Sequence, residues 1–163
     1  MSQTSTSSRI AVFPGTFDPF TLGHLDLIRR GSRLYEQLIV GVGENPDKSP
    51  LMQASERTQL VRQAVGDLVN VRVESYTGLT VDFARRCGAG VLLRGIREAA
   101  DLHTETAIAQ TNRQVSGIET VFVLPAPQYE FISSRLVRQI AQAGGDVSGM
   151  VPPDVLAHLA KRS

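Results

Sequence analysis

The sequence predicts an α/β fold in which a doubly wound, five-stranded parallel sheet carries helices on both faces. Five short runs rich in Val, Ile and Leu lack polar alternation, which is typical of strands buried on both faces of a parallel sheet. Helical patterns separate these runs, and this alternation favours parallel pairing through right-handed crossovers. The predicted strands span residues 10–13, 38–42, 70–73, 91–93 and 121–124.

The helical candidates are delimited by residues with clear capping preferences. Ser55 is expected to cap the second helix and Ser133 the fifth, because a serine hydroxyl can accept a bond from a free N–H of the first turn. Gly88 is expected to end the third helix, and Pro153 to begin the last one. The six helices are predicted at residues 24–35, 56–65, 81–87, 98–115, 133–143 and from 153 onward.

The composition narrows the class of protein. A chain of 163 residues with 42% hydrophobic content can form one domain with its own core. We predict a single domain over residues 9–163, preceded by a disordered polar tail at residues 1–8. The net charge of +1 gives no field that favours nucleic acid or an anionic membrane, and no apolar stretch is long enough to span a bilayer. The single cysteine excludes an internal disulfide, and we predict a cytoplasmic protein.

The first motif follows the first predicted strand and reads Phe-Pro-Gly-Thr-Phe-Asp-Pro-Phe-Thr-Leu-Gly-His over residues 13–24. In a doubly wound sheet, ligands bind beyond the carboxyl ends of the strands, where this motif lies. Gly15 allows a ligand to approach the backbone, and Thr16 offers a hydroxyl and an amide. Gly23 and His24 lie at the start of a helix, where free N–H groups and the helix dipole favour phosphate.

Three later motifs also follow predicted strands and carry phosphate-binding chemistry. Lys48 lies in a polar loop after the second strand, and Arg94 and Arg97 flank Gly95 after the fourth. A guanidinium can bind phosphate through two parallel hydrogen bonds. Ser133 and Ser134 precede a helix whose free amides can hold phosphate oxygens, although both serines could equally be simple caps. No group of residues has the spacing of metal ligands, so we expect no zinc or iron site held by the protein.

Together these motifs resemble the nucleotidyltransferase superfamily, and Thr-Leu-Gly-His at residues 21–24 is similar to the bacterial phosphopantetheine adenylyltransferases in particular. Most members of the superfamily have His where this chain has Thr21. The resemblance covers residues 9–160 and implies a Rossmann-like nucleotidyltransferase fold. It also implies transfer of AMP from ATP to 4′-phosphopantetheine, giving dephospho-coenzyme A and pyrophosphate in coenzyme A biosynthesis.

The resemblance also implies roles for individual residues. His24 and Lys48 would be catalytic, with His24 stabilising the transition state. The acceptor would be bound by Thr16, Lys48, Thr80 and Arg94. ATP would be bound by Thr16, Phe17, His24, Gly95, Ile96, Arg97, Glu105, Tyr129, Glu130, Phe131, Ile132, Ser133, Ser134 and Arg135. The family has a third serine where this chain has Arg135, so the hydroxyl of that position is missing here.

The family further implies Mg²⁺ as the cofactor, coenzyme A as a feedback ligand and a homohexameric assembly. Two alternatives remain open from the residues. Another nucleotidyltransferase, for example one acting on nicotinate mononucleotide, would usually keep His at the position of Thr21. A module that senses ATP or coenzyme A without turnover would not need Thr16, His24, Lys48 and Arg94 together.

Overall fold

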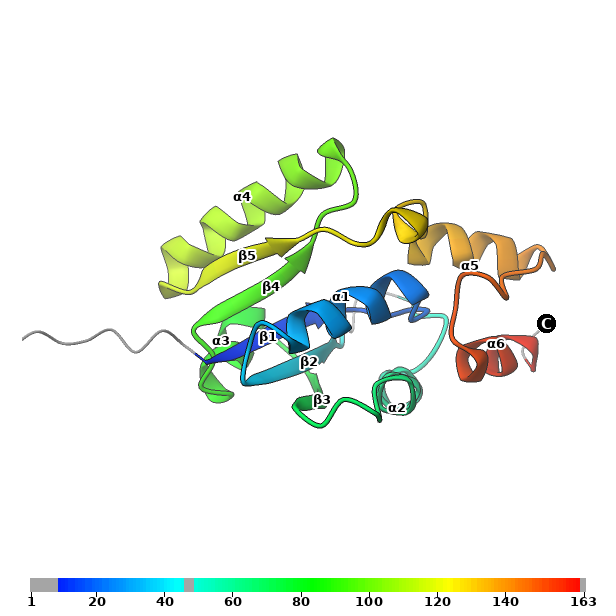
Figure 1. Cartoon of the computed structure of the whole chain (residues 1–163), viewed down its shortest axis with the longest axis horizontal. Helices are drawn as coiled ribbons and strands as arrows, with labels where there is room; N and C mark the ends of the chain where they lie inside the picture. The colour runs from blue at the N-terminus through cyan, green and yellow to red at the C-terminus, as the bar shows by residue number, and fades with distance from the viewer. Residues whose placement is uncertain (1–8, 46–48, 162–163) are drawn as a thin grey trace, which may run out of the picture.

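The computed structural model describes residues 9–45 and 49–161, which form a five-stranded, all-parallel sheet of order β3-β2-β1-β4-β5 (Figure 1). This arrangement confirms the predicted α/β fold. The predicted tail at residues 1–8 lies outside the described residues. The strands are β1 (Ile10–Gly15), β2 (Gln37–Gly43), β3 (Val71–Tyr76), β4 (Val91–Gly95) and β5 (Glu119–Val123).

Helices connect the strands, and two more follow the last strand. Figure 1 shows that the arrowheads of β4 and β5 point toward the end of the molecule where α5 lies. None of the helices among the described residues combines the length and the apolar character needed to cross a bilayer. The helices are α1 (Leu22–Ser32), α2 (Ala54–Ala64), α3 (Thr80–Arg86), α4 (Ala99–Ser116), α5 (Ser134–Gln142) and α6 (Pro153–Ala160), with a 3₁₀ turn η1 at Pro127–Tyr129.

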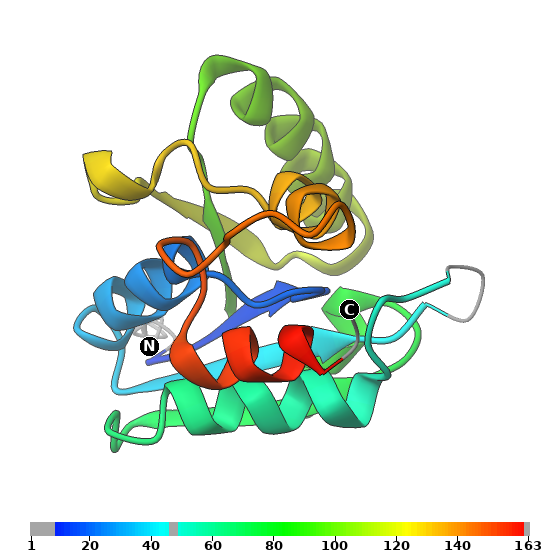
Figure 2. The same cartoon turned by 90° about the vertical axis from the view of Figure 1, so that its right-hand side faces the viewer.

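Side chains alternate between the two faces of the sheet and so build two separate cores. Ala11 and Phe13 of β1 face the larger core, which α1, α2, α5 and α6 cover. Val12 of the same strand faces the smaller core beneath α3, together with Ile39 of β2. Figure 2 shows α2 and α6 side by side below the sheet, with α4 at the far edge beside β5.

The apolar runs predict five strands buried on both faces of the sheet, but only some of the strands are buried in this way. The middle four or five residues of β1 and β2 are fully buried. By contrast, β3 and β5 form the edges of the sheet, and Val121 of β5 is 37% exposed. The difference in burial follows from whether a strand lies at the centre or at the edge of the sheet. The sequence of a single strand does not contain that information.

Two predicted helix starts are wrong because the loops before them supply the capping contacts. α1 begins at Leu22, two residues earlier than expected, since the Thr21 hydroxyl accepts a bond from the His24 N–H. α2 begins at Ala54 with Gln53, not Ser55, in the capping position, and the Gln53 N–H donates to the Glu56 carboxylate at 2.7 Å. The predicted cap Ser133 and the predicted start at Pro153 are confirmed.

We expect Gly117→Ala to destabilise the fold through its backbone alone. Gly117 closes α4 with φ of +76°, and a Cβ there would meet nothing within 4 Å. A left-handed conformation costs a residue with a Cβ about 1–2 kcal/mol. The free energy of unfolding, measured by urea titration, should fall by that amount. Gly149→Ala is the control, because its Cβ also meets nothing and its φ is not in the left-handed region; an equal loss in both variants would contradict the explanation.

Candidate active site

A cleft of about 810 Å³ opens at the carboxyl ends of β1 and β4, where the two halves of the sheet diverge. Most of the site residues predicted from the sequence line this one cleft. They come from four separate segments of the chain, so the fold brings distant motifs together. The predicted residues in its lining are Thr16, Phe17, His24, Thr80, Arg94, Gly95, Arg97, Glu105, Tyr129, Ile132, Ser133, Ser134 and Arg135.

Four predicted residues are not placed in the cleft. Ile96 is buried, and its N–H already donates to the Val123 carbonyl at 3.1 Å. Glu130 is exposed and Phe131 is 63% exposed, and neither lines the cleft. Lys48 lies outside the described residues.

The loop after β1 is packed tightly against the histidine of the first motif. Phe17 has a left-handed φ of 54° and is buried, and its ring meets the His24 imidazole edge-on with centroids 5.0 Å apart. A Cβ on Gly15 would come within 2.7 Å of the Phe17 ring, so a glycine is required there. Phe20 stacks on the imidazole with centroids 5.6 Å apart, and its ring also contacts that of Phe17 at 5.7 Å. The two aromatic rings thus fix the plane of the histidine.

A hydrogen bond sets the tautomer of His24, and burial sets its protonation state. The Thr21 backbone N–H donates to His24 Nδ1 at 3.1 Å, so Nδ1 is an acceptor and the ring proton belongs on Nε2. Burial first, and then the nearby charges of Arg97 and Arg94, lower the pKa of His24 from 6.5 to about 3. The imidazole is therefore neutral at physiological pH and can donate one hydrogen bond from Nε2.

Arg94 is held rigidly at the end of β4. Its Nη1 donates to the Pro14 carbonyl at 2.8 Å, and its Nε donates to Glu105 of α4 at 2.8 Å. Burial alone would lower the pKa of Arg94, but the hydrogen bond and the charge of Glu105 outweigh it and raise the pKa. Glu105, which the resemblance assigned to ATP binding, is thus bound to an arginine.

Arg97 is held in a similar way and joins two elements of the site. Its Nε and Nη2 donate to Asp101, one turn before Glu105 on α4, at 3.0 and 3.1 Å. Its Nη1 donates to the Ile132 carbonyl at 3.2 Å, just before α5. Burial alone would raise the pKa of Asp101, but hydrogen bonds from Arg97 lower it, so Asp101 is ionised at neutral pH.

The start of α5 forms another wall of the cleft. The Ser133 hydroxyl accepts a bond from the Leu136 N–H at 3.2 Å, and the Ser134 hydroxyl donates to the Pro19 carbonyl at 2.8 Å. Both hydroxyls therefore have partners within the protein. The N–H groups at the first positions of the helix remain suited to an anion, and Arg135 adds an exposed guanidinium beside them.

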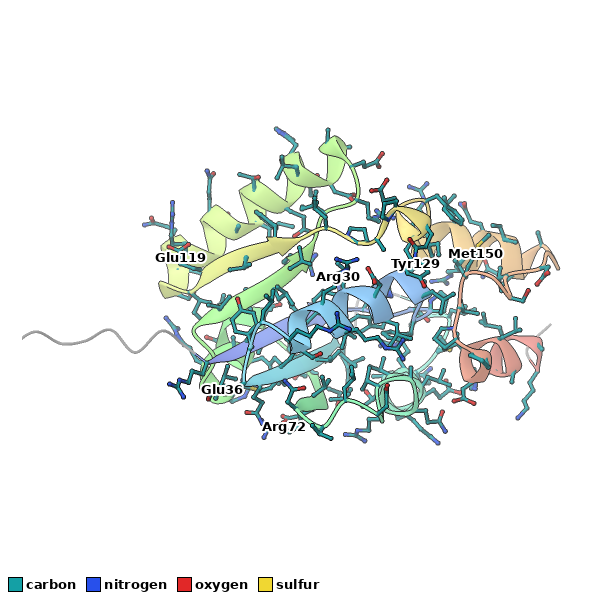
Figure 3. The ribbon with its side chains drawn as sticks, in the orientation of Figure 1. Arg30, Glu36, Arg72, Glu119, Tyr129 and Met150 are labelled. Atoms are coloured by element: carbon teal, nitrogen blue, oxygen red, sulfur yellow. The ribbon has the colours of Figure 1, made fainter. Side chains whose placement is uncertain are left out.

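Two segments that are distant in sequence approach the start of α1, beside the cleft. The Leu22 N–H donates to the Met150 carbonyl at 2.9 Å, and the Tyr129 carbonyl would lie 3.7 Å from a Cβ on Gly23. Figure 3 labels Tyr129 and Met150 on these two segments. On the opposite wall, the Thr80 hydroxyl shares a hydrogen bond of 2.8 Å with the Tyr76 hydroxyl.

Sequence reasoning missed four charged residues that line the cleft, namely Asp101, described above, and Arg57, Asp18 and Arg138. Arg57 of α2 is 3% exposed and donates to three backbone carbonyls. Asp18 accepts bonds from the N–H groups of Leu51 and Met52 at 2.6 and 3.0 Å, and Arg138 of α5 lies 3.6 Å from Asp18. One signal was available for Arg57: it stands three and four residues before Leu60 and Val61, so a charge occupies the apolar face of its helix.

The cleft has a positive surplus that suits polyphosphate. Within the described parts of the chain, five arginines and three carboxylates line it. The carboxylates are paired with arginines, so the remaining positive charge is available to a ligand. Clefts of one sign focus the field onto charged ligands.

Comparison with known proteins agrees with this geometry. Residues 12–140 match the cytidylyltransferase-like family. The chain is 49% identical over 151 residues to a phosphopantetheine adenylyltransferase of Synechocystis sp., covering 92% of this chain and 95% of the relative. It is 48% identical over 159 residues to a phosphopantetheine adenylyltransferase of Stenotrophomonas maltophilia, covering 97% and 94%.

A solved structure shares the fold at lower identity. A nicotinate-nucleotide adenylyltransferase candidate from Vibrio parahaemolyticus aligns with a TM-score of 0.67 and 20% identity, over 93% of this chain and 97% of that one. At this identity the likeness concerns the fold alone. The family match and the close relatives carry the assignment: the chain belongs to the cytidylyltransferase-like family and, within it, to the phosphopantetheine adenylyltransferases.

Proposed function

We propose that this protein transfers AMP from ATP to 4′-phosphopantetheine, giving dephospho-coenzyme A and pyrophosphate in coenzyme A biosynthesis. The observation that carries the proposal is the convergence of His24, Arg94, Arg97 and the start of α5 on one cleft. Two phosphate-bearing substrates need such a concentration of donors. The family membership of the chain gives the substrates, and the cleft gives the means of holding them.

The reaction is a direct displacement at the α-phosphorus of ATP. An oxygen of the phosphopantetheine phosphate attacks this phosphorus, and the new P–O bond forms as the bond to pyrophosphate breaks. Pyrophosphate leaves with the electron pair. The attacking phosphate is already anionic near neutral pH, so the site needs no general base. Catalysis then depends on positioning and charge stabilisation, and positioning can supply about 7–11 kcal/mol of barrier reduction.

His24 is proposed to donate from Nε2 to an oxygen of the α-phosphate. Phe17 and Phe20 fix the ring plane, and Thr21 fixes the tautomer. A donor that is already oriented costs no reorganisation as negative charge develops. By resemblance to the family, Lys48 would add a mobile positive charge at the same oxygens and at the acceptor phosphate.

The remaining cleft residues are proposed to divide between the substrates. Thr16, Arg94 and Thr80 would hold 4′-phosphopantetheine, with Arg94 on its phosphate. Arg97 and the first turn of α5 would hold ATP, with Arg135 contributing a guanidinium where the family has a serine. The other ATP contacts proposed from the sequence, at Gly95, Glu105, Tyr129 and Ile132, also line the cleft.

Mg²⁺ is proposed to enter with ATP, where it would neutralise charge on the triphosphate. No group of three or more acidic, histidine or cysteine side chains capable of holding a metal occurs among residues 9–45 and 49–161. We therefore propose that the ion takes most of its ligands from water and substrate oxygens, as Mg²⁺ commonly does.

Assembly, regulation and location are proposed from the family. A homohexamer would give a partner to the exposed apolar side chains Leu102, Ile108 and Val115 of α4. Coenzyme A would act as a feedback ligand because it shares the pantetheine and adenylyl groups of the substrates. We also propose a cytoplasmic location, and sedimentation of the purified protein would test the assembly.

A pyrophosphate-release assay tests the function. With ATP and Mg²⁺, we expect release to require 4′-phosphopantetheine, because the cleft is proposed to hold its phosphate in line with the α-phosphorus. Nicotinate mononucleotide serves as the control acceptor. Release with nicotinate mononucleotide alone would reject the proposed substrate, and binding of ATP without release would indicate a sensor.

Replacing His24 by Ala should lower kcat by about 10²–10³, the loss typical when one oriented transition-state donor is removed. The thermal unfolding midpoint should also fall, because the imidazole packs on Phe17 and Phe20 and accepts a bond from the Thr21 N–H, so kcat is compared at a temperature where the variant is folded. His103→Ala is the matched control, since His103 is exposed on α4 and outside the cleft. A His24→Ala enzyme with normal kcat would remove His24 from the mechanism.

The pH dependence of stability should reveal that His24 is neutral. Its pKa is about 3 in the folded protein and near 6.5 when unfolded. As the pH falls below about 6.5, only the unfolded chain takes up this proton, so the free energy of unfolding should decrease. When the pH is lowered from 7.5 to 5.0, the urea midpoint of unfolding should therefore fall more for the wild type than for His24→Gln. An imidazole of His24 that titrates near pH 6.5 in NMR spectra of the native protein would refute this.

A further inference from the structure

Arg57 joins three segments of the site through backbone carbonyls. It lies on α2 and is 3% exposed. Its Nη1 donates to the Thr16 carbonyl at 2.5 Å and to the Gly43 carbonyl at 3.0 Å, and its Nε donates to the Met52 carbonyl at 3.0 Å. These carbonyls belong to the loop after β1, the end of β2 and the approach to α2. One planar guanidinium therefore fixes three chain segments relative to one another.

The charge of Arg57 is paired differently from the charges of the two half-buried arginines at the end of β4. Arg94 and Arg97 are paired with Glu105 and Asp101. Among the described residues, Arg57 has only neutral carbonyl partners and no carboxylate. A buried charge without an opposite partner is costly, and an apolar side chain usually suits such a position better. Because Arg57 lines the cleft, an anionic ligand would supply the missing countercharge.

The hydrogen bond from Arg57 to the Thr16 carbonyl also orients the Phe17 N–H, which lies on the opposite side of the same peptide. The Thr16 carbonyl belongs to the Thr16–Phe17 peptide, which is trans, so the Phe17 N–H points away from Arg57. Both residues line the cleft. Among the described residues, Phe17 is the only non-glycine residue with a left-handed φ. Such a conformation persists only where the surrounding contacts hold it. Arg57 supplies one of those contacts.

We propose that Arg57 is a positioning residue for the adenylyl transfer. It holds the Thr16–Phe17 peptide with the Phe17 N–H turned away from the guanidinium, and it places in the cleft lining a positive charge that no carboxylate of the described residues pairs with. It does not touch the reacting atoms itself. This inference rests on the proposed function, because it assigns Arg57 a part in the same reaction.

The test compares Arg57 with Arg62, which offers a matched control on the same helix. Arg62 also donates to a backbone carbonyl, that of Val73 at 3.0 Å, but it does not line the cleft. Both Arg57→Met and Arg62→Met should lower the thermal unfolding midpoint. Only Arg57→Met should lower kcat, by about 10²-fold, the loss that a displacement of roughly 1 Å can cause. Its KM for ATP should change less than its kcat.

A second pair keeps the test decisive if Arg57→Met does not fold. Arg57→Lys retains the charge but loses the planar fork, so its kcat should lie between those of Arg57→Met and the wild type, whereas Arg62→Lys should have normal kcat. Equal kcat values for Arg57→Lys and Arg62→Lys, at a temperature where both are folded, would overturn the inference.

The failure of the proposed function would look different. In that case the wild type would release no pyrophosphate with 4′-phosphopantetheine. The role of Arg57 would then be judged by calorimetric titration with MgATP, in which Arg57→Lys should bind more weakly than Arg62→Lys. Equal affinities of these two variants would reject Arg57 as a positioning residue for the nucleotide phosphates.

Discussion

The order of the strands is the constraint on which the site depends. β1 lies between β2 and β4, and the chain leaves it toward one edge of the sheet before returning to fill the other. The loops after β1 and β4 therefore separate and leave a crevice at their carboxyl ends. His24 reaches the crevice from the first turn of α1, which follows β1, and Arg94 reaches it from the end of β4. Neither motif could act on the other's ligand if the two strands were not neighbours.

Within that crevice, Arg94 and Arg97 are held in place by contacts inside the protein. Glu105 and Asp101 lie one turn apart on α4 and hold Arg94 and Arg97, respectively. Donors that are already held need not reorganise during the reaction, which is where an enzyme gains most over water. The same carboxylates reduce the net charge that a substrate meets. Arg57, which has no carboxylate partner among residues 9–45 and 49–161, and the exposed Arg135 then account for much of the remaining attraction of these residues for phosphate.

The sequence was informative where short stretches of chain determine the structure by themselves. The five strands, the helix start at Ser133 and the motif ending in His24 could all be predicted locally. The failures involve partners far away in sequence: Arg57 bonds to Thr16, 41 residues away, and Asp18 to Met52, 34 residues away. The capping contacts of Gln53 also depend on a loop that Asp18 holds. The pairing of Arg94 with Glu105 was missed because family motifs describe contacts with ligands and not contacts between the site residues themselves.

The glycine at position 15 links local sterics to the chemistry of the cleft. The Phe17 ring fills the space that a Cβ at position 15 would need, and the imidazole of His24 rests against that ring. A methyl group at position 15 would therefore displace the Phe17 ring, and that ring would in turn displace the His24 imidazole. The backbone of β1 therefore limits where the Phe17 ring and the His24 imidazole can lie. A substitution at position 15 should misalign the hydrogen bond from His24 Nε2 before it prevents the chain from folding.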